Sequence, residues 1–577
     1  MTKIAKTLSL SFVFSLCIWN NLNCQHNSDI ISGIVGKQLD RFFSKAETNG
    51  FAGVIMVVKD GEILLRKGYG IADADNNVSY TSTTSFNMGS IEKQFCASAI
   101  LKLEMMGKLD VYDPITKFFS NVPDDKKEIT IHQLLTHTSG LNHMTNEDVT
   151  VAITKEDAEK RIMAQKLEAR PGEKFTYSNS GYGLLAMIVE KVSGIPYEKF
   201  MRDNLFIPAG MNNTGYVLHK YDKKNVATGI MDGVKLYKPY EVGWLKDGLG
   251  WALRGAGGFL ITVDDFYKWH LALEGDKILS EEAKKKLYTP HVPKGKVPGA
   301  GGPAYGYGWF LKTTDRNTPM IEHGGNFGSY SADFRRFPED NLVIIAGGNT
   351  LSNPPRPLLS TIEKIIYGKY TELNANIIKT YTGVYRLPSG SKMNVSFDEN
   401  NSLKIEFTDF NSLIAANGSE GLEDTEAAKE KSQFIKTAWE ESAEGNYEKT
   451  HKVLGGNATL EEYSKTSDNW WKEMKEKYGA FKSVDVLGSV ERPNGFIISY
   501  MTVKHVKGEI KFLHVWNGER ITQSFPIKKY DMFFTMRNEQ EFFSGLAGKT
   551  ITLGMENDKL VIIIKGQTKQ VKAEKEK

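Results

Sequence analysis

Apolar positions in the first part of the chain follow two different spacings. Residues 51–70 hold two apolar runs around an Asp-Gly pair at 60–61, which is the pattern of a β-hairpin. Residues 91–110 place apolar side chains three and four positions apart, which predicts a largely buried helix that ends at Gly107. With a further helix expected over residues 28–48, the pattern predicts a helix, a hairpin and a buried helix in that order.

Later segments predict more helices and then a group of strands. The expected helices lie within residues 129–141, 177–194, 256–275 and 359–370, and the expected strands lie within residues 305–313, 328–338 and 340–348. Strands at both ends of this region, with helices between them, are typical of an α+β domain built around an antiparallel sheet. We therefore expect one α+β domain over residues 28–370.

The pattern changes near residue 381 to short, alternating strands. These lie within residues 382–390, 392–397, 402–407, 548–555 and 560–566. Between them, residues 422–480 are helical and charged, and residues 495–516 form a long predicted hairpin. We expect a β-rich accessory domain over residues 375–577 with an α+β insertion over residues 420–525, in which the aromatic residues form a core.

The first 24 residues place two lysines before an apolar stretch and then turn polar, which is typical of a secretory signal peptide. The alternative is a buried N-terminal helix. Cys24 is a candidate lipid anchor, although the residues before it match the usual lipoprotein signal poorly. We expect an exported protein, periplasmic or secreted, and no other stretch of the sequence is apolar for long enough to span a bilayer.

Composition narrows the possible functions. The 577 residues are 40% hydrophobic and 25% charged with a formal net charge of +3, and no long basic run precedes the C-terminal tail, so nucleic acid is not an expected partner. Three cysteines exclude a disulfide framework, and Cys96 falls in an apolar helix as a core residue. The spacing of His132, His137 and His143 does not favour zinc, and we expect no metal or cofactor.

Ser90 and Lys93 stand three positions apart at the start of the predicted helix over residues 91–110, so they share one helix face. Ser90 is either a helix cap or a nucleophile. The same spacing recurs at Ser389 and Lys392, where nothing suggests catalysis. The spacing alone therefore does not decide between the two roles.

Two further motifs lie in the same predicted domain. Tyr177 and Asn179 belong to a Y-S-N that precedes a helix, and His323 begins an H-G-G just before a predicted strand. Each has a simple structural explanation, as a turn tyrosine or a tight bend. Together with Ser90 and Lys93 they supply a hydroxyl, an amine, a phenol, an amide and a glycine-rich strand edge.

This combination resembles the serine β-lactamase and penicillin-binding-protein superfamily, and within it the class C β-lactamase, esterase and D-aminopeptidase group. The resemblance covers roughly residues 30–370, with an S-x-x-K at Ser90, a Y-x-N at Tyr177 and an H-x-G at His323 where the family often has K-T-G. It implies a β-lactamase/transpeptidase-like fold and a serine hydrolase that acts on a small molecule or a peptide through an acyl-enzyme on Ser90.

The resemblance also implies roles for the other residues. Either Lys93 or Tyr177 takes the proton of Ser90, and the sequence does not choose between them. Asn179 holds Lys93 and the substrate amide. The backbone N–H groups of Ser90 and Asn326 form an oxyanion hole, and Gly325 lets the substrate approach the strand edge.

His323 departs from the family pattern in an informative way. A lysine there supplies a permanent positive charge for the carboxylate of a penicillin or of a peptide, whereas histidine, with a reference pKa of about 6.5, is mostly neutral at neutral pH. We therefore expect weak β-lactam turnover and better hydrolysis of uncharged esters or amides. The alternative is that His323 fills space or pairs with Glu322.

Two rival functions remain at this point. The first is a β-lactamase or a D,D-peptidase that acts on cell-wall peptides. The second is a penicillin-recognising receptor or binding protein that is acylated without turnover.

Overall fold

The computed structural model describes the chain from residue 29 to residue 576 with internal gaps. The described residues are 29–48, 50–74, 76–142, 152–219, 221–231, 234–235, 237–241, 243–298, 302–350, 355–368, 375–397, 403–408, 422–423, 425–455, 459–491, 496–527, 531–538, 541–544, 549–556, 559–565 and 570–576. The predicted signal peptide over residues 1–24, Cys24 and His143 lie outside them. The chain divides into two compact units, residues 1–370 and 371–577.

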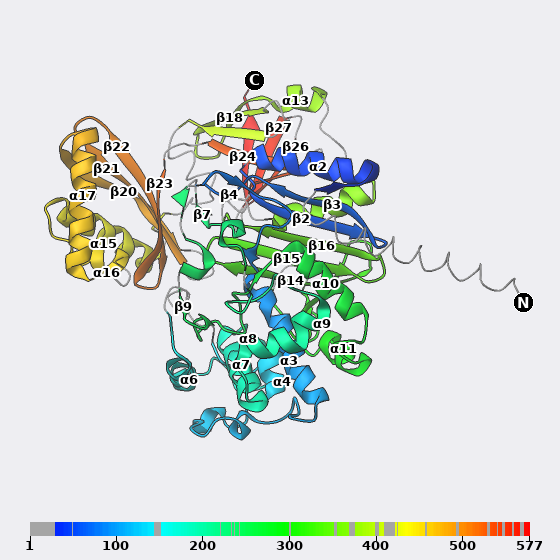
Figure 1. Ribbon diagram of the computed structural model, residues 1–577. Helices are drawn as coiled ribbons and strands as arrows, with labels where there is room; N and C mark the ends of the chain where they lie inside the picture. The colour runs from blue at the N-terminus through cyan, green and yellow to red at the C-terminus, as the bar shows by residue number, and fades with distance from the viewer. Residues whose placement is uncertain are drawn as a thin grey trace, which may run out of the picture. The chain divides into compact units, whose positions relative to one another are not determined.

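The first unit is built on an eight-stranded antiparallel sheet with the order β1-β3-β2-β16-β15-β14-β13-β12 (Figure 1). The strands are β1 (Ile30–Ile31), β2 (Gly53–Lys59), β3 (Glu62–Tyr69), β12 (Ala304–Tyr305), β13 (Phe310–Thr313), β14 (Pro319–Phe327), β15 (Tyr330–Phe337) and β16 (Leu342–Gly348). The predicted hairpin is confirmed, because β2 and β3 pair across a turn in which Asp60 and Gly61 both have positive φ. Strand β2 also pairs with β16, so a strand from the start of the unit's sequence lies beside a strand from near its end.

Helices cover both faces of this sheet (Figure 1). In β2, Val54 and Met56 enter one core and Ile55 and Val57 enter the other, as the alternation of side chains along a strand requires. The first core includes α3 (Glu92–Met105), α7 (Asn179–Ser193) and α10 (Val263–Glu274). The second includes α2 (Gly33–Thr48) and α12 (Leu359–Ile366). Cys96 is a buried residue of α3, as predicted.

Two of the predicted helices are shorter than their segments. Within residues 129–141 only α4 (Ile131–Leu135) forms, because His137 has a positive φ that a helix does not accommodate. Within residues 256–275 the chain first forms strand β11 (Leu260–Ile261), and α10 begins after Thr262, whose side chain caps it. Polar caps and left-handed turns therefore set these boundaries more than the apolar spacing does.

Short elements complete the first unit. The helices are α6 (Lys155–Ala164), α8 (Tyr197–Met201), α9 (Ile207–Ala209) and α11 (Glu281–Tyr288), and the strands are β4 (Ile71–Asp73), β5 (Val78–Ser79), β6 (Phe86–Asn87), β7 (Ile230–Met231), β8 (Val234–Lys235), β9 (Trp244–Leu245) and β10 (Gly248–Leu249). No helix in the described part of the chain is both long and apolar enough to cross a membrane.

The second unit contains a closed sheet with an inserted segment. The closed sheet has the order β17-β18-β19-β24-β25-β26-β27-β28, and β17 pairs with β28. Its strands are β17 (Gly383–Arg386), β18 (Lys392–Phe397), β19 (Leu403–Phe407), β24 (Asp531–Asn538), β25 (Glu541–Ser544), β26 (Lys549–Glu556), β27 (Lys559–Lys565) and β28 (Gln570–Lys575). Helix α13 (Ala375–Tyr381) precedes it.

The inserted segment lies between β19 and β24 in sequence and combines helices with a four-stranded sheet. Its elements are α15 (Glu426–Ala443), α16 (Glu448–Leu454), α17 (Leu460–Tyr478), β20 (Phe481–Glu491), β21 (Phe496–His505), β22 (Glu509–Asn517) and β23 (Arg520–Ile527). Trp439, Phe512 and Trp516 are buried in its core, with Trp470 and Trp471 packed against them. The prediction that these aromatic residues form a core is confirmed.

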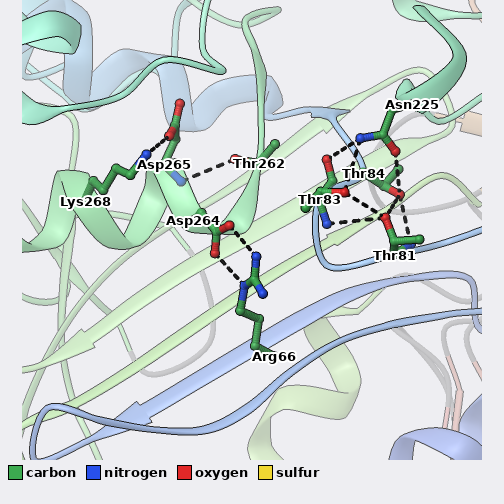
Figure 2. Close-up of polar contacts among 9 residues, drawn as sticks. All are labelled: Arg66, Thr81, Thr83, Thr84, Asn225, Thr262, Asp264, Asp265 and Lys268. Atoms are coloured by element: carbon green, nitrogen blue, oxygen red, sulfur yellow. Dashed lines mark hydrogen bonds and ion pairs between the residues drawn. The ribbon is translucent and has the colours of Figure 1, made fainter. Parts of the chain in front are cut away.

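Polar contacts fix the segments around the sheet (Figure 2). Arg66 in β3 is almost fully buried and binds both carboxylate oxygens of Asp264, in the first turn of α10, at 2.6 and 2.5 Å. Asn225 donates to the carbonyl of Thr83 at 2.7 Å, next to the start of β6. The first contact ties a helix to the sheet, and the second anchors the chain shortly before Ser90.

We predict that Asp264→Ala destabilises the protein by about 3 kcal/mol, because it leaves the buried Arg66 guanidinium without its carboxylate partner. The measurement is the free energy of unfolding in urea. As a control, Lys199→Ala removes an exposed ion pair with Asp203 and costs about 0.5 kcal/mol or less. Equal losses in the two variants would contradict the importance of the Arg66 contact.

Candidate active site

Ser90 lies in a short 3-10 helix, η1 (Gly89–Ile91), that leads into α3. The Asn87 side chain holds this turn, because its Oδ1 accepts from the Gly89 N–H at 2.8 Å and its Nδ2 donates to the Gly258 carbonyl at 3.2 Å. Ser90 caps neither η1 nor α3, whose cap residues make no side-chain cap bond. The cap interpretation of Ser90 is therefore wrong, and its half-buried hydroxyl is left for contacts with Lys93 and Tyr177.

Lys93 is fully buried and its amine is surrounded by three oxygen atoms. The Nζ atom lies 3.1 Å from Ser90 Oγ, 2.8 Å from Asn179 Oδ1 and 2.6 Å from the Ala256 carbonyl oxygen. The Tyr177 ring also faces it, with its centroid 4.9 Å away. Burial lowers the pKa of Lys93 to about 7, and the opposing effect of the Glu92 charge is smaller.

Tyr177 and Asn179 are held by the start of α7. Ser178 caps this helix by accepting from the Gly181 N–H at 3.1 Å, which fixes the residues on either side of it. Burial raises the pKa of the Tyr177 phenol above its usual value, and a hydrogen bond with Ser90 offsets part of that rise. The structure therefore brings Ser90, Lys93, Tyr177 and Asn179 together.

The H-G-G motif precedes β15, the strand predicted to follow it, and itself lies inside β14, a strand that the sequence pattern does not predict. Glycine has a low propensity for strands. β14 nevertheless pairs with β15 through Gly324↔Asp333 and Gly325↔Ala332, and this pairing overrides the local propensity. The pairing of β14 with β13 ends at Glu322. Beyond that residue η1 packs against β14.

Three glycines allow this close packing. A Cβ atom on Gly325 would lie 1.9 Å from the Met88 carbonyl oxygen, and one on Gly89 would lie 2.5 Å from the Asn326 nitrogen. A Cβ on Gly257 would lie 3.0 Å from the Gly89 carbonyl carbon. Only residues without side chains let the backbones around Ser90 and Asn326 approach this closely.

His323 is buried at the same end of β14. Its Nδ1 donates to the Gly324 carbonyl at 2.7 Å, and its Nε2 lies 3.5 Å from the Tyr305 hydroxyl. Burial, and secondly the Lys93 charge, lowers the pKa of His323 to about 3, so the ring is neutral at physiological pH. Glu322 binds Lys312 and Arg356, so the alternative in which it pairs with His323 is wrong.

Sequence reasoning missed two contacts of the site. The Ala256 carbonyl binds Lys93, and Tyr305 lies between His137 and His323, with its hydroxyl 3.2 Å from His137 Nε2. The signal for Ala256 was available, since the glycines around it indicate a close backbone approach. Tyr305 belongs to a strand far from His137 in sequence, so no local pattern could reveal it.

The second serine-lysine pair does not form a comparable site. Ser389 is exposed, and Lys392 forms an ion pair with Glu576 at 2.9 Å. Within the described ranges no group of three or more His, Cys, Asp and Glu side chains is arranged to hold a metal. His132 instead contacts the Tyr307 hydroxyl at 2.7 Å.

The family model described as Beta-lactamase matches residues 39–363, which is more than half of the chain. The chain belongs to the beta-lactamase family. The match covers the sheet apart from β1, the helices α3, α7 and α10 on its first face, and every candidate site residue named above.

Individual relatives agree with this family. Bacillus subtilis (strain 168) PbpX, whose name assigns it to the penicillin-binding proteins, is 37% identical over 42% of this chain, and the match spans 59% of PbpX. The octameric penicillin-binding protein homologue of Pyrococcus abyssi has 22% identity and a TM-score of 0.54, with 94% of this chain and 100% of that chain covered. The D-amino acid amidase of Ochrobactrum anthropi SV3 has 21% identity and a TM-score of 0.50, with 58% and 99% covered.

We predict that Gly325→Ala in this beta-lactamase family member destabilises the protein by about 2 kcal/mol, because the new methyl group would lie 1.9 Å from the Met88 carbonyl oxygen and forces β14 away from η1. The free energy of unfolding in urea measures the loss. Gly275→Ala is the matched control, since its Cβ would meet only the Leu271 carbonyl oxygen at 3.9 Å. An equal free energy of unfolding in the two variants would contradict the prediction.

Proposed function

We propose that this protein is an exported serine hydrolase that cleaves an ester or amide bond through an acyl-enzyme on Ser90. The observation that carries the proposal is the position of the buried Lys93 amine, 3.1 Å from the Ser90 hydroxyl oxygen. A serine hydroxyl needs an adjacent base to become a nucleophile at neutral pH. Family membership supports the same reaction class, because the fold is shared with a D-amino acid amidase.

The contacts of Lys93 favour it as the base. A neutral amine has two N–H groups and one lone pair, and the Asn179 Oδ1 and the Ala256 carbonyl are both acceptors. If each takes one N–H, the lone pair is directed at the Ser90 hydroxyl. A pKa of about 7 makes this neutral form accessible at physiological pH.

Tyr177 suits a different role. Because burial raises the pKa of its phenol above the usual value, the tyrosinate form is disfavoured at neutral pH. A neutral phenol next to Ser90 is a hydrogen-bond donor and a proton relay to the leaving group. We therefore assign Lys93 as the base and Tyr177 as the proton carrier.

The reaction then proceeds in two halves. Ser90 Oγ attacks the substrate carbonyl while Lys93 accepts its proton, and the N–H groups of Ser90 and Asn326 stabilise the oxyanion. The proton returns through Tyr177 to the leaving alcohol or amine, which departs as the acyl-enzyme forms. In the second half, water adds to the acyl carbonyl and gives a proton to Lys93. The ester bond to Ser90 Oγ then breaks, Lys93 returns the proton to Oγ, and the acid product leaves.

The charges around the site favour uncharged substrates. His323 is neutral, so it offers no cation to a substrate carboxylate. Arg356, which lies against Gly324, is paired with Asp333 at 2.7 Å and with Glu322 at 3.1 Å. We therefore propose esters, amides or uncharged peptides as substrates, with Asn179 binding the substrate amide.

The direct test of this function is labelling with a fluorophosphonate probe. We expect one adduct on the Ser90 peptide by mass spectrometry, and no adduct in Ser90→Ala. The labelling rate should rise with pH around a midpoint near 7, because Lys93 accepts a proton only in its neutral form.

An adduct elsewhere, or none at all, would refute Ser90 as the nucleophile. Ser389→Ala serves as the control, since Ser389 also precedes a lysine by three positions but is exposed, and that lysine is paired with Glu576.

The main alternative is a β-lactamase or D,D-peptidase that acts on cell-wall peptides, and the likeness to PbpX favours it. We predict that purified protein hydrolyses short p-nitrophenyl esters faster than nitrocefin, because His323 is neutral and the Arg356 guanidinium near it is already paired with Asp333 and Glu322. Faster turnover of nitrocefin would reverse the assignment. A lasting penicillin adduct on Ser90 without turnover would indicate the receptor alternative.

A further inference from the structure

Glu92 precedes Lys93 at the start of α3, and the mechanism above gives it no role. Its carboxylate is fully buried, a position in which an ionised carboxyl is costly unless it is hydrogen-bonded. Oε1 accepts from the Tyr216 hydroxyl at 2.5 Å and from the Gly255 N–H at 2.9 Å, and Oε2 accepts from the Phe259 N–H at 3.1 Å. A fourth donor, the Tyr197 hydroxyl, lies 3.4 Å from Oε1. Burial raises the pKa of Glu92 to about 7, and the bonds from Tyr216, Gly255 and Phe259 offset part of that rise because they favour the carboxylate.

These bonds fix the position of residues 255–259, the segment whose carbonyl accepts a hydrogen bond from Lys93. Gly255 and Phe259 lie on either side of Ala256, whose carbonyl accepts from Lys93 at 2.6 Å. Gly255 and Gly258 have positive φ, so this glycine-rich segment has many conformations available unless its ends are held. Glu92 holds both ends and thereby fixes the direction of the Ala256 carbonyl.

Glu92 also supplies charge to the candidate base. The groups whose charges act on the Lys93 amine are Glu92 and Cys96, and Glu92 favours its protonated form. Burial raises the pKa of the Cys96 thiol, which keeps that group neutral. Glu92 is thus the neighbour whose negative charge acts on Lys93 once its carboxyl ionises, even though the two side chains make no direct ion pair among the described contacts.

The other titratable groups that the structure describes around Glu92 and Lys93 are either neutral or held in ion pairs. Burial raises the pKa of each of the four surrounding phenols, Tyr177, Tyr182, Tyr197 and Tyr216. His323 is neutral as described, and the Arg356 charge that acts on it is paired with Glu322 and Asp333. Arg254, whose charge acts on Tyr216, is paired with Asp247 at 2.8 Å.

We propose that Glu92 is a positioning residue of the active site, which fixes the Ala256 carbonyl through Gly255 and Phe259 and provides the counter-charge of the Lys93 ammonium. This inference rests on the proposed function, since it assigns Glu92 a task in preparing Lys93. It predicts two separable effects of altering Glu92. Loss of the hydrogen bonds to Gly255 and Phe259 lowers the reaction rate. Loss of the Glu92 charge changes the pH at which Lys93 gives up its proton.

The experiment measures the rate of Ser90 labelling by the fluorophosphonate probe as a function of pH. In Glu92→Gln we expect the midpoint of the acid limb to fall by about one pH unit, because an ammonium without its counter-charge loses its proton more readily. The maximal rate should also fall, since the amide nitrogen of Gln has no lone pair for one of the backbone N–H groups. In Glu92→Asp the charge remains, so the midpoint should stay near that of the wild type while the rate falls.

Asp265→Asn is the matched control (Figure 2). Asp265 is a fully buried carboxylate that also anchors a loop, accepting from the Asn213 N–H at 2.6 Å and from Lys268 at 2.9 Å. Its charge is not among those that act on Lys93. The variant loses the same charge from an equally buried position, and its midpoint should not move.

Tyr216→Phe tests the inference if Glu92→Gln fails to fold. It removes one donor to the carboxylate and keeps both backbone bonds, so Glu92 protonates more readily and the midpoint should move in the same direction by a smaller amount. A midpoint unchanged in both Glu92→Gln and Tyr216→Phe, or in Tyr216→Phe if Glu92→Gln does not fold, with labelled wild type, would overturn the role of Glu92 alone. Absence of labelling in the wild type would overturn the proposed function itself.

Discussion

Burial of the Lys93 amine is the constraint on which the site depends. An ammonium removed from water is costly, and the protein offsets that cost only in part, with a carbonyl, an amide oxygen and a nearby carboxylate. This incomplete offset lowers the pKa of Lys93 to about 7, which suits the role of base proposed for it. A more exposed lysine would stay protonated at neutral pH. A lysine in direct contact with an ionised Glu92 would also stay protonated.

The sheet makes this burial possible. Strands such as β2 are covered on both faces, so the helix that carries Lys93 packs against a surface that excludes water. Glycines in β14 and η1 let the backbones of these two elements pack directly against each other. The same packing that buries the amine therefore also sets the two N–H groups proposed for the oxyanion hole.

Much of this architecture could be predicted from the sequence, and the failures have physical causes. The hairpin at Asp60 and the buried helix after Ser90 follow from local spacing, which is why both were predicted. β14 was not predicted around His323 because Gly324 and Gly325 have low strand propensity, although β14 forms a local hairpin with β15. The glycines around Ala256 indicated a close backbone approach, but the partner of its carbonyl and the partners of Glu92 lie far away in the chain, and a spacing pattern carries no information on such contacts.

The closed sheet of the second unit has a consequence for how the chain folds. Leu403 in β19 pairs with Phe534 in β24, so the closed sheet is completed only after the whole inserted segment has been synthesised. Closing so long a loop costs entropy that grows with the logarithm of its length. An inserted segment that first collapses around Trp439 and Trp516 draws its own ends together and shortens the effective loop. The aromatic core of the insertion thus helps to bring β19 and β24 together, although Trp439 and Trp516 belong to neither strand.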